Sequence, residues 1–158
     1  MDQKIFICFC DYFDNAFQKI VSEVTDVQFI QDENETVQNC IGGKKLSSIV
    51  RVVGLYKGRI HIEMHVDLAR RLYEYSNGEP PQDEMDLCFY LAEFTNVVAG
   101  NGITALNNIY KSNNLRLMPP AIFADENLEI IIPQFLSAKK TYSTKYGAVL
   151  IEIGFEGW

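Results

Sequence analysis

Apolar residues near the start of the chain recur with helical spacing. Between about Asp11 and Val24 they fall three or four positions apart, which places them along one face of an α-helix. This stripe consists of Phe13, Phe17, Ile20, Val21 and Val24. The polar stretch that follows ends in Gly42-Gly43, a pair typical of a turn. The pattern therefore predicts an amphipathic first helix, followed by a loop.

The next segment alternates apolar and polar residues on both sides of Lys57-Gly58, which is typical of a β-hairpin. In its second run one face carries Ile60, Ile62, Met64 and Val66, and the other carries Arg59, His61, Glu63 and His65. Such alternation predicts one face in the core and one in solvent. His61, Glu63 and His65 could also suggest a metal site, because imidazole and carboxylate are common ligands. Alternate strand residues are about 6.6 Å apart, which separates the two histidines by about 13 Å and favours an ordinary solvent face.

Two helices are expected after the hairpin. Asp67 fits the N-cap of a short helix that ends at Asn77-Gly78. Pro80-Pro81 separates it from a long helix, from about Asp83 to Lys111, which stops before Pro119-Pro120. The remainder alternates strands and turns through the runs AIF, LEIIIP, KKTYST and AVLIEIGF. This order of elements predicts an α+β fold, a two-layer sandwich of helices packed on a largely antiparallel sheet.

Composition narrows the class of protein. The chain has 158 residues, 47% of them apolar, and contains no long linker, so residues 1–158 are expected to form a single domain. Its net charge of −7 makes nucleic acid and anionic membranes poor partners. No apolar run is long enough to span a bilayer, and the first ten residues do not resemble a signal peptide. The cysteines Cys8, Cys10, Cys40 and Cys88 fit neither a zinc site nor a disulfide framework, which favours reduced thiols and a cytoplasmic location.

The long helix has two distinct faces. Its apolar arc, which predicts the core side, consists of Leu87, Leu91, Phe94, Val98, Ala105 and Ile109. Asn101 falls on that side and is expected to be a buried amide bonded to backbone or to a neighbouring strand. The opposite side carries a row formed by Phe89, Glu93, Asn96, Gly100, Ile103 and Asn107. A glycine in mid-helix costs about 1 kcal/mol relative to alanine. Close approach of another molecule is a natural reason for Gly100, although by spacing alone the row also fits a solvated helix face.

The segment LAEFTNVVAGNGITAL, residues 91–106, resembles the signature helix of the CheC/CheX/FliY family of chemotaxis phosphatases. The shared pattern is a glutamate, two residues, an asparagine, and a small–Gly–Asn step leading into TAL. The amphipathic first helix, VGLYKGRIHIEM, DLARRLYEYSNG and LMPPAIF also occur in the family's order. A single E-x-x-N helix makes the chain look like CheX. One departure is Phe89, where family members often have an acidic residue or serine.

The resemblance implies an enzyme that hydrolyses the aspartyl phosphate of a CheY-like response regulator. Asn96 would hold the attacking water, because an amide both donates and accepts hydrogen bonds and stays neutral beside a phosphoryl group. Glu93 would pair with a lysine near the receiver's active site, while Phe89, Gly100, Ile103 and Asn107 would contact the partner. No metal or cofactor of its own is expected, since the receiver carries Mg²⁺. The alternative is a non-catalytic module of the same fold that docks onto a receiver or onto itself.

The remaining expectations concern assembly and two weaker motifs. CheX-like proteins are associated with dimers made through sheet edges, and the C-terminal strand, with Val149, Ile151, Ile153 and Phe155 on one face, is interpreted as such an edge. This predicts a homodimer. A second E-x-x-N, Glu74 to Asn77, is interpreted as a helix cap. The run GGKKLS lacks the first glycine of a phosphate-binding loop and is not interpreted as a nucleotide site.

Overall fold

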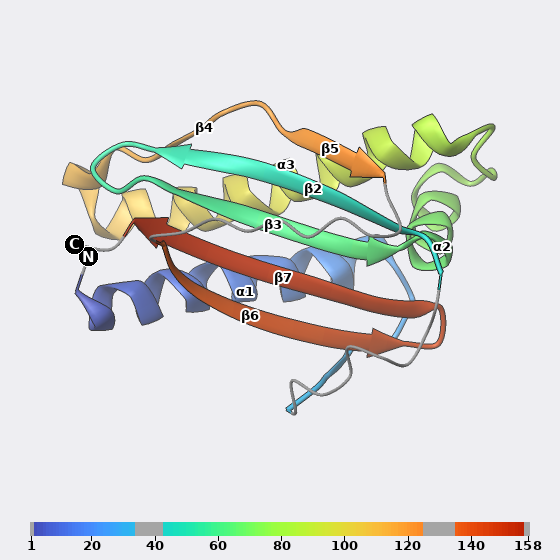
Figure 1. Cartoon of the computed structure of the whole chain (residues 1–158), viewed down its shortest axis with the longest axis horizontal. Helices are drawn as coiled ribbons and strands as arrows, with labels where there is room; N and C mark the ends of the chain where they lie inside the picture. The colour runs from blue at the N-terminus through green and yellow to red at the C-terminus, as the bar shows by residue number, and fades with distance from the viewer. Residues whose placement is uncertain (1, 34–42, 125–134, 157–158) are drawn as a thin grey trace.

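Two long helices lie side by side across one face of an antiparallel β-sheet, and a shorter helix lies at one end of the sheet (Figure 1). The computed structural model describes residues 2–33, 43–124 and 135–156. The helices are α1 (Gln3–Val24), α2 (Val66–Asn77) and α3 (Glu84–Ile109), and a 3₁₀ turn, η2 (Lys111–Asn113), follows α3. In Figure 1, α1 and α3 are the two helices behind the sheet. The predicted α+β two-layer sandwich is therefore confirmed.

Within the described residues, seven strands form one sheet in which every pairing is antiparallel. They are β1 (Ile30–Gln31), β2 (Lys45–Val53), β3 (Gly58–His65), β4 (Arg116–Leu117), β5 (Ala121–Ala124), β6 (Phe135–Thr144) and β7 (Gly147–Glu156). The spatial order is β1-β6-β7-β3-β2-β4, and β5 also pairs with β2. The strand expected in the run LEIIIP lies outside the described residues.

The C-terminal strand β7 is central in the sheet, so its interpretation as an edge is wrong. It pairs with β3 on one side and with β6 on the other. The apolar face that suggested a dimer-forming edge strand packs instead under the helices. Its residues Val149, Ile151, Ile153 and Phe155 are all buried. An apolar strand face indicates that the strand packs against the helix layer. It does not indicate whether the strand is central or at the edge, because that depends on pairings between distant segments.

Helix α1 begins about two turns earlier than its apolar stripe predicted. Asp2 caps it by accepting a hydrogen bond from the Lys4 backbone N–H at 2.9 Å. Phe6, Phe9 and Cys10 continue the buried stripe toward the N-terminus. Exposed and half-buried apolar residues lie between them, which hides the helical period in the sequence.

The hairpin of β2 and β3 forms around Lys57-Gly58 as predicted, but the expectation of a solvent-facing side on β3 is wrong. Ile60, Ile62 and Met64 are buried under the helices, yet Arg59 and His61 on the opposite side are also buried. Their polar groups bond within the sheet layer: Arg59 pairs with Glu152 of β7 at 3.3 Å, and His61 contacts Ser47 of β2 at 3.2 Å. A central strand flanked on both sides can bury polar residues when they satisfy each other.

The short helix α2 is capped by His65 rather than by Asp67. The His65 Nδ1 accepts a hydrogen bond from the Asp67 backbone N–H at 3.3 Å, so Asp67 lies in the first turn. At the other end, Gly78 adopts the left-handed conformation at φ 75°, and the Asn77 amide donates to the Tyr73 carbonyl. The interpretation of the second E-x-x-N as a helix cap is thus confirmed.

Candidate functional site

The row predicted on the long helix lies along one side of α3, opposite its most deeply buried arc. Leu87, Leu91, Phe94 and Val98 are buried as expected on the core side. On the opposite side, Phe89 and Glu93 are exposed, and Asn96, Gly100, Ile103 and Asn107 are half-buried. Each is three or four residues from the next, so all six follow one line along the helix. We refer to these six residues as the α3 row.

The side chains of Asn96 and Glu93 have no hydrogen bond or ion pair to any other group within residues 2–33, 43–124 and 135–156. Other acids at this end of α3 are engaged: Glu84 pairs with Lys44 at 2.6 Å, and Asp86 accepts a hydrogen bond from the Gln82 backbone N–H at 2.8 Å. A half-buried amide without an internal partner is costly unless water or another molecule satisfies it. The chain therefore presents one amide and one carboxylate, a single helical turn apart, for bonds outside itself.

Gly100 leaves open space in the row, and packing among the described residues does not require a glycine there. A Cβ at this position would meet only Leu117 Cδ1, at an ordinary contact distance of 3.9 Å. Gly102, two residues later, is different, because a Cβ there would clash with the ring of Phe13 in α1. The close packing of α1 on α3 therefore accounts for Gly102 and leaves Gly100 without an internal explanation. The sequence analysis did not single out Gly102. Its place on the buried side of α3 could have identified it as a position where two helices pack closely.

Asn107 takes part in the fold as well as in the row. Its amide nitrogen donates to the Leu115 carbonyl, and its amide oxygen accepts from the Leu115 N–H, both at 2.9 Å. This pair of bonds fastens the segment after η2 to α3 and brings β4, with Leu117, up to Gly100. We therefore assign Asn107 a structural role at the end of the row.

The structure corrects two positions assigned to the core side. Asn101 is exposed, although its amide does bond to backbone, donating to the Val97 carbonyl at 2.8 Å. Ile109 is 54% exposed because α3 ends there. The buried arc extends instead through Thr95, Ala99 and Leu106. The side of α3 that packs on α1 and the sheet is therefore shifted around the helix from the arc predicted by the largest residues.

The exposed side of α3 that carries the row extends one helical turn further toward the N-terminus than predicted. Met85, four residues before Phe89, is 56% exposed, and Phe89 itself is 67% exposed. The same i, i+4 spacing that linked Phe89 to Glu93 could have found Met85.

The metal alternative on the hairpin has no support from the geometry. His61 lies between Ser47 and Glu152, and His65 caps α2, so each histidine has a structural role. Among the described residues, no group of three or more His, Cys, Asp or Glu side chains is arranged to hold a metal ion. Cys8, Cys10 and Cys88 are free thiols, and burial raises the pKa of Cys10 to about 12. Cys40 lies outside the described residues.

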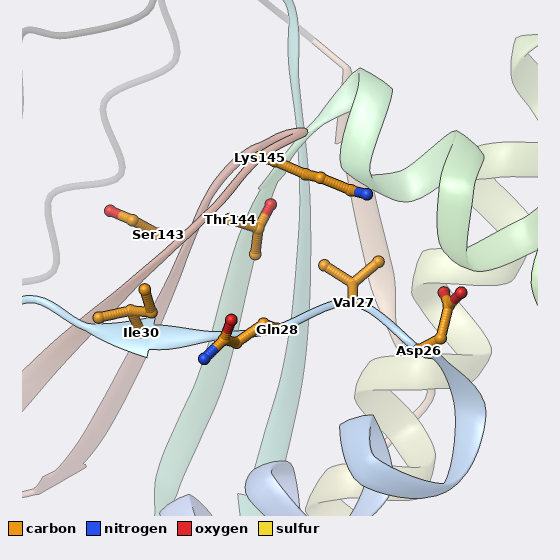
Figure 2. Close-up of a pocket in the computed structure, with 7 residues that line it drawn as sticks. All are labelled: Asp26, Val27, Gln28, Ile30, Ser143, Thr144 and Lys145. Carbon is orange, nitrogen blue, oxygen red and sulfur yellow. The ribbon is translucent and has the colours of Figure 1, made fainter.

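A shallow pocket of about 530 Å³ lies away from the row, between the segment after α1 and the β6–β7 turn (Figure 2). Its lining residues are Asp26, Val27, Gln28, Ile30, Ser143, Thr144 and Lys145. Asp26 is already paired with Arg71 at 2.9 Å. With one remaining charged side chain and no residue from α3, this pocket offers no cluster of reactive groups, and the α3 row is the better candidate site.

Comparison with known proteins places the same helix in a family context. The sequence matches the family model for chemotaxis phosphatase CheX over residues 46–146, a range that contains the entire α3 row. No curated protein matches the chain. No helix among the described residues is long and apolar enough to cross a membrane.

Several solved structures share the fold. A CheC-like superfamily protein from Shewanella sp. PV-4 is 23% identical, with 99% of this chain and 100% of that chain covered and a TM-score of 0.80. The chemotaxis protein CheX from Vibrio vulnificus is 18% identical, with 94% and 96% covered and a TM-score of 0.79. The CheX-CheY-BeF3-Mg²⁺ complex from Borrelia burgdorferi contains a chain that is 23% identical, with 94% and 98% covered and a TM-score of 0.77.

These structures establish the shared architecture, and the family model, which spans well over half of the chain, establishes the relationship. Helix α3, which presents Glu93 and Asn96, lies inside the matched region. This chain belongs to the CheX family of chemotaxis phosphatases.

Proposed function

We propose that this protein hydrolyses the aspartyl phosphate of a CheY-like receiver domain, using Asn96 and Glu93 of α3. The observation that carries the proposal is a carboxylate and an amide, on the outer side of α3 in a CheX-family protein, that have no partner among the described residues. The related Borrelia burgdorferi structure contains CheX together with CheY, BeF3 and Mg²⁺, which supports a receiver as the partner.

The chemistry needs little from this chain. An aspartyl phosphate is an activated mixed anhydride, and the Mg²⁺ on the receiver neutralises charge on the phosphoryl oxygens. A water in line with the phosphorus–oxygen bond attacks phosphorus, the bond to the aspartate breaks, and the products are inorganic phosphate and a free carboxylate. Asn96 holds that water by accepting a hydrogen bond from it and donating one to it or to the phosphoryl group. The amide remains neutral throughout, so it does not repel the phosphate.

Glu93 performs a different task. A carboxylate next to the phosphoryl group would be repelled, so we assign it to a lysine of the receiver. That ion pair sets the helix in register and places Asn96, one turn away, over the phosphorus. Gly100, without a side chain, and Ile103 extend the contact surface along the same side of α3.

Two substitutions separate the roles. Asn96→Ala is expected to lower the rate constant for receiver dephosphorylation by about 10²-fold or more, because the water loses its orientation, while receiver binding is largely kept. Glu93→Ala is expected to weaken both binding and turnover. The measurement is the decay of a phosphorylated receiver, together with its affinity in the presence of BeF3⁻ and Mg²⁺.

Asn101→Ala is the matched control, because it removes an exposed amide of the same helix that lies outside the row. It should leave the decay rate within about twofold of the parent. If Asn96→Ala dephosphorylated the receiver as fast as the parent, Asn96 would not position the water. If the parent bound the receiver without accelerating decay, the docking-module alternative would replace the enzyme.

A further inference from the structure

Two large apolar side chains continue the α3 row at its N-terminal end. Phe89 is 67% exposed and Met85 is 56% exposed, and they are four residues apart on the same helix. Side chains at this spacing lie next to each other, about 5–6 Å apart at their Cβ atoms. Phe89 is also four residues before Glu93, so the apolar pair adjoins the carboxylate directly. Aromatic residues and methionine are enriched at protein–protein interfaces relative to the rest of the surface.

The charges around this pair restrict the chemistry of a partner. Helix α3 contains no lysine or arginine, and its charged residues are Glu84, Asp86 and Glu93. Glu84 forms an ion pair with Lys44, and Asp86 accepts a hydrogen bond from the Gln82 backbone N–H. Glu93 is therefore the one acid of α3 that has no bond within the described residues. The surface offers an apolar contact followed by a single negative charge, which complements a partner with an apolar side chain next to a cation.

We infer that the Met85–Phe89 pair determines which receiver domains this protein accepts. The pair would bind an apolar side chain of the receiver that lies close to the receiver lysine paired with Glu93, at about the 5.4 Å pitch of one helical turn. This inference rests on the proposed function, and it specifies the partner more narrowly than that proposal does. A receiver with a polar or acidic residue at that place leaves the Phe89 ring in contact with polar groups and gains little from burying it.

The physical basis is the area that the pair removes from water. Aromatic residues at the centre of an interface contribute disproportionately to affinity, because they bury a large rigid surface at a low entropic cost. The contact forms when the receiver binds and does not change during attack by water. It therefore contributes equally to the ground state and the transition state, which lowers KM without changing kcat. Asn96 is expected to act in the opposite way, mainly on kcat.

The test uses the full chain and a panel of receivers, and takes as the reference the receiver that the parent binds most tightly when it is loaded with BeF3⁻ and Mg²⁺. Phe89→Ala and Met85→Ala should raise the Kd for the BeF3⁻- and Mg²⁺-loaded reference receiver and its KM at least about fivefold, with kcat within about twofold. Phe89→Leu, which keeps an apolar side chain, should recover most of the affinity. The ratio of kcat/KM between the reference receiver and the next best should fall in Phe89→Ala.

Ile109→Ala is the matched control. Ile109 belongs to the same helix and is 54% exposed, but it lies on the side opposite Phe89. This variant should bind the reference receiver as the parent does. Equal Kd values for Phe89→Ala and the parent would overturn the inference, while the proposed function would still stand if the parent dephosphorylates the receiver. A parent that binds receivers without dephosphorylating them would overturn the proposed function alone, because the Kd comparison would still decide the role of the apolar pair.

Discussion

Gly100 and Gly102 are two residues apart in α3 and have opposite surroundings. A side chain at position 100 would enter open space near Leu117, whereas one at position 102 would clash with Phe13. Gly100→Ala is therefore expected to stabilise the protein by about 0.5–1 kcal/mol, because alanine restricts the unfolded chain and favours the helix. Gly102→Ala is expected to destabilise it by about 1–3 kcal/mol through overpacking. Urea unfolding of both variants measures these changes.

The same pair of variants tests the role of Gly100 in receiver contact. If the position allows close approach of a partner, Gly100→Ala should lower the affinity for a receiver even as it raises the free energy of unfolding. A more stable protein with unchanged receiver affinity would show that Gly100 does not touch the partner. This opposition between stability and binding is expected where a helix accepts a weak helix former to fit another molecule.

Among the elements, the central strands β3 and β7 carry a buried ionic group that responds to pH. Glu152 lies 3.3 Å from Arg59 and 3.6 Å from His61. The nearby His61 ring, with smaller effects of Lys139 and Arg59, holds the pKa of Glu152 below its ordinary value, although burial alone would raise it. Since the folded-state pKa is lowered, the ionised carboxylate stabilises the fold above its unfolded-state pKa. That contribution is lost as the pH falls through the folded-state pKa.

Glu152→Gln is therefore expected to lower the free energy of unfolding at about pH 7, and the difference from the parent should shrink below about pH 4. Urea unfolding across this range measures the effect. Glu156→Gln is the control, because Glu156 belongs to the same strand and is exposed. A Glu152→Gln difference that stayed constant down to acidic pH would contradict an ionic contribution from this carboxylate.

At the scale of the whole molecule, the sheet leaves long strands near its margins. Among the described residues, β6 pairs with β7 along ten positions but with β1 only at Tyr142 and Ser143. Unpaired strand edges promote association with a second copy. We therefore expect a homodimer, with an edge such as that of β6, and not the central β7, as the contact. Light scattering at micromolar concentration should give twice the chain mass of 18.0 kDa; a monomeric mass would contradict this prediction.

Local patterns in the sequence were sufficient for most of the elements and for the position of the candidate site. The apolar stripe from Phe13 to Val24 defined α1 except for its first turns. Lys57-Gly58 defined the hairpin, and the proline pairs bounded α3. The spacing of Glu93, Asn96 and Gly100 placed them on one side of a helix, and the structure shows that side facing away from the core. These features depend on residues within a few turns of each other, so the spacing of residue types in the sequence is enough to predict them.

The tertiary structure alone decided the questions that depend on distant neighbours. Both sides of β3 are buried, β7 is central, and Asn101 faces out. Periodicity distinguishes two faces of an element, but it does not reveal what covers each face or which strands pair. The same reason separates Gly100 from Gly102, because the difference lies in a ring of α1 about ninety positions away in the sequence. It also separates Asn96 from Asn107, since only the folded chain brings Leu115 to one amide and leaves the other without a bond among the described residues.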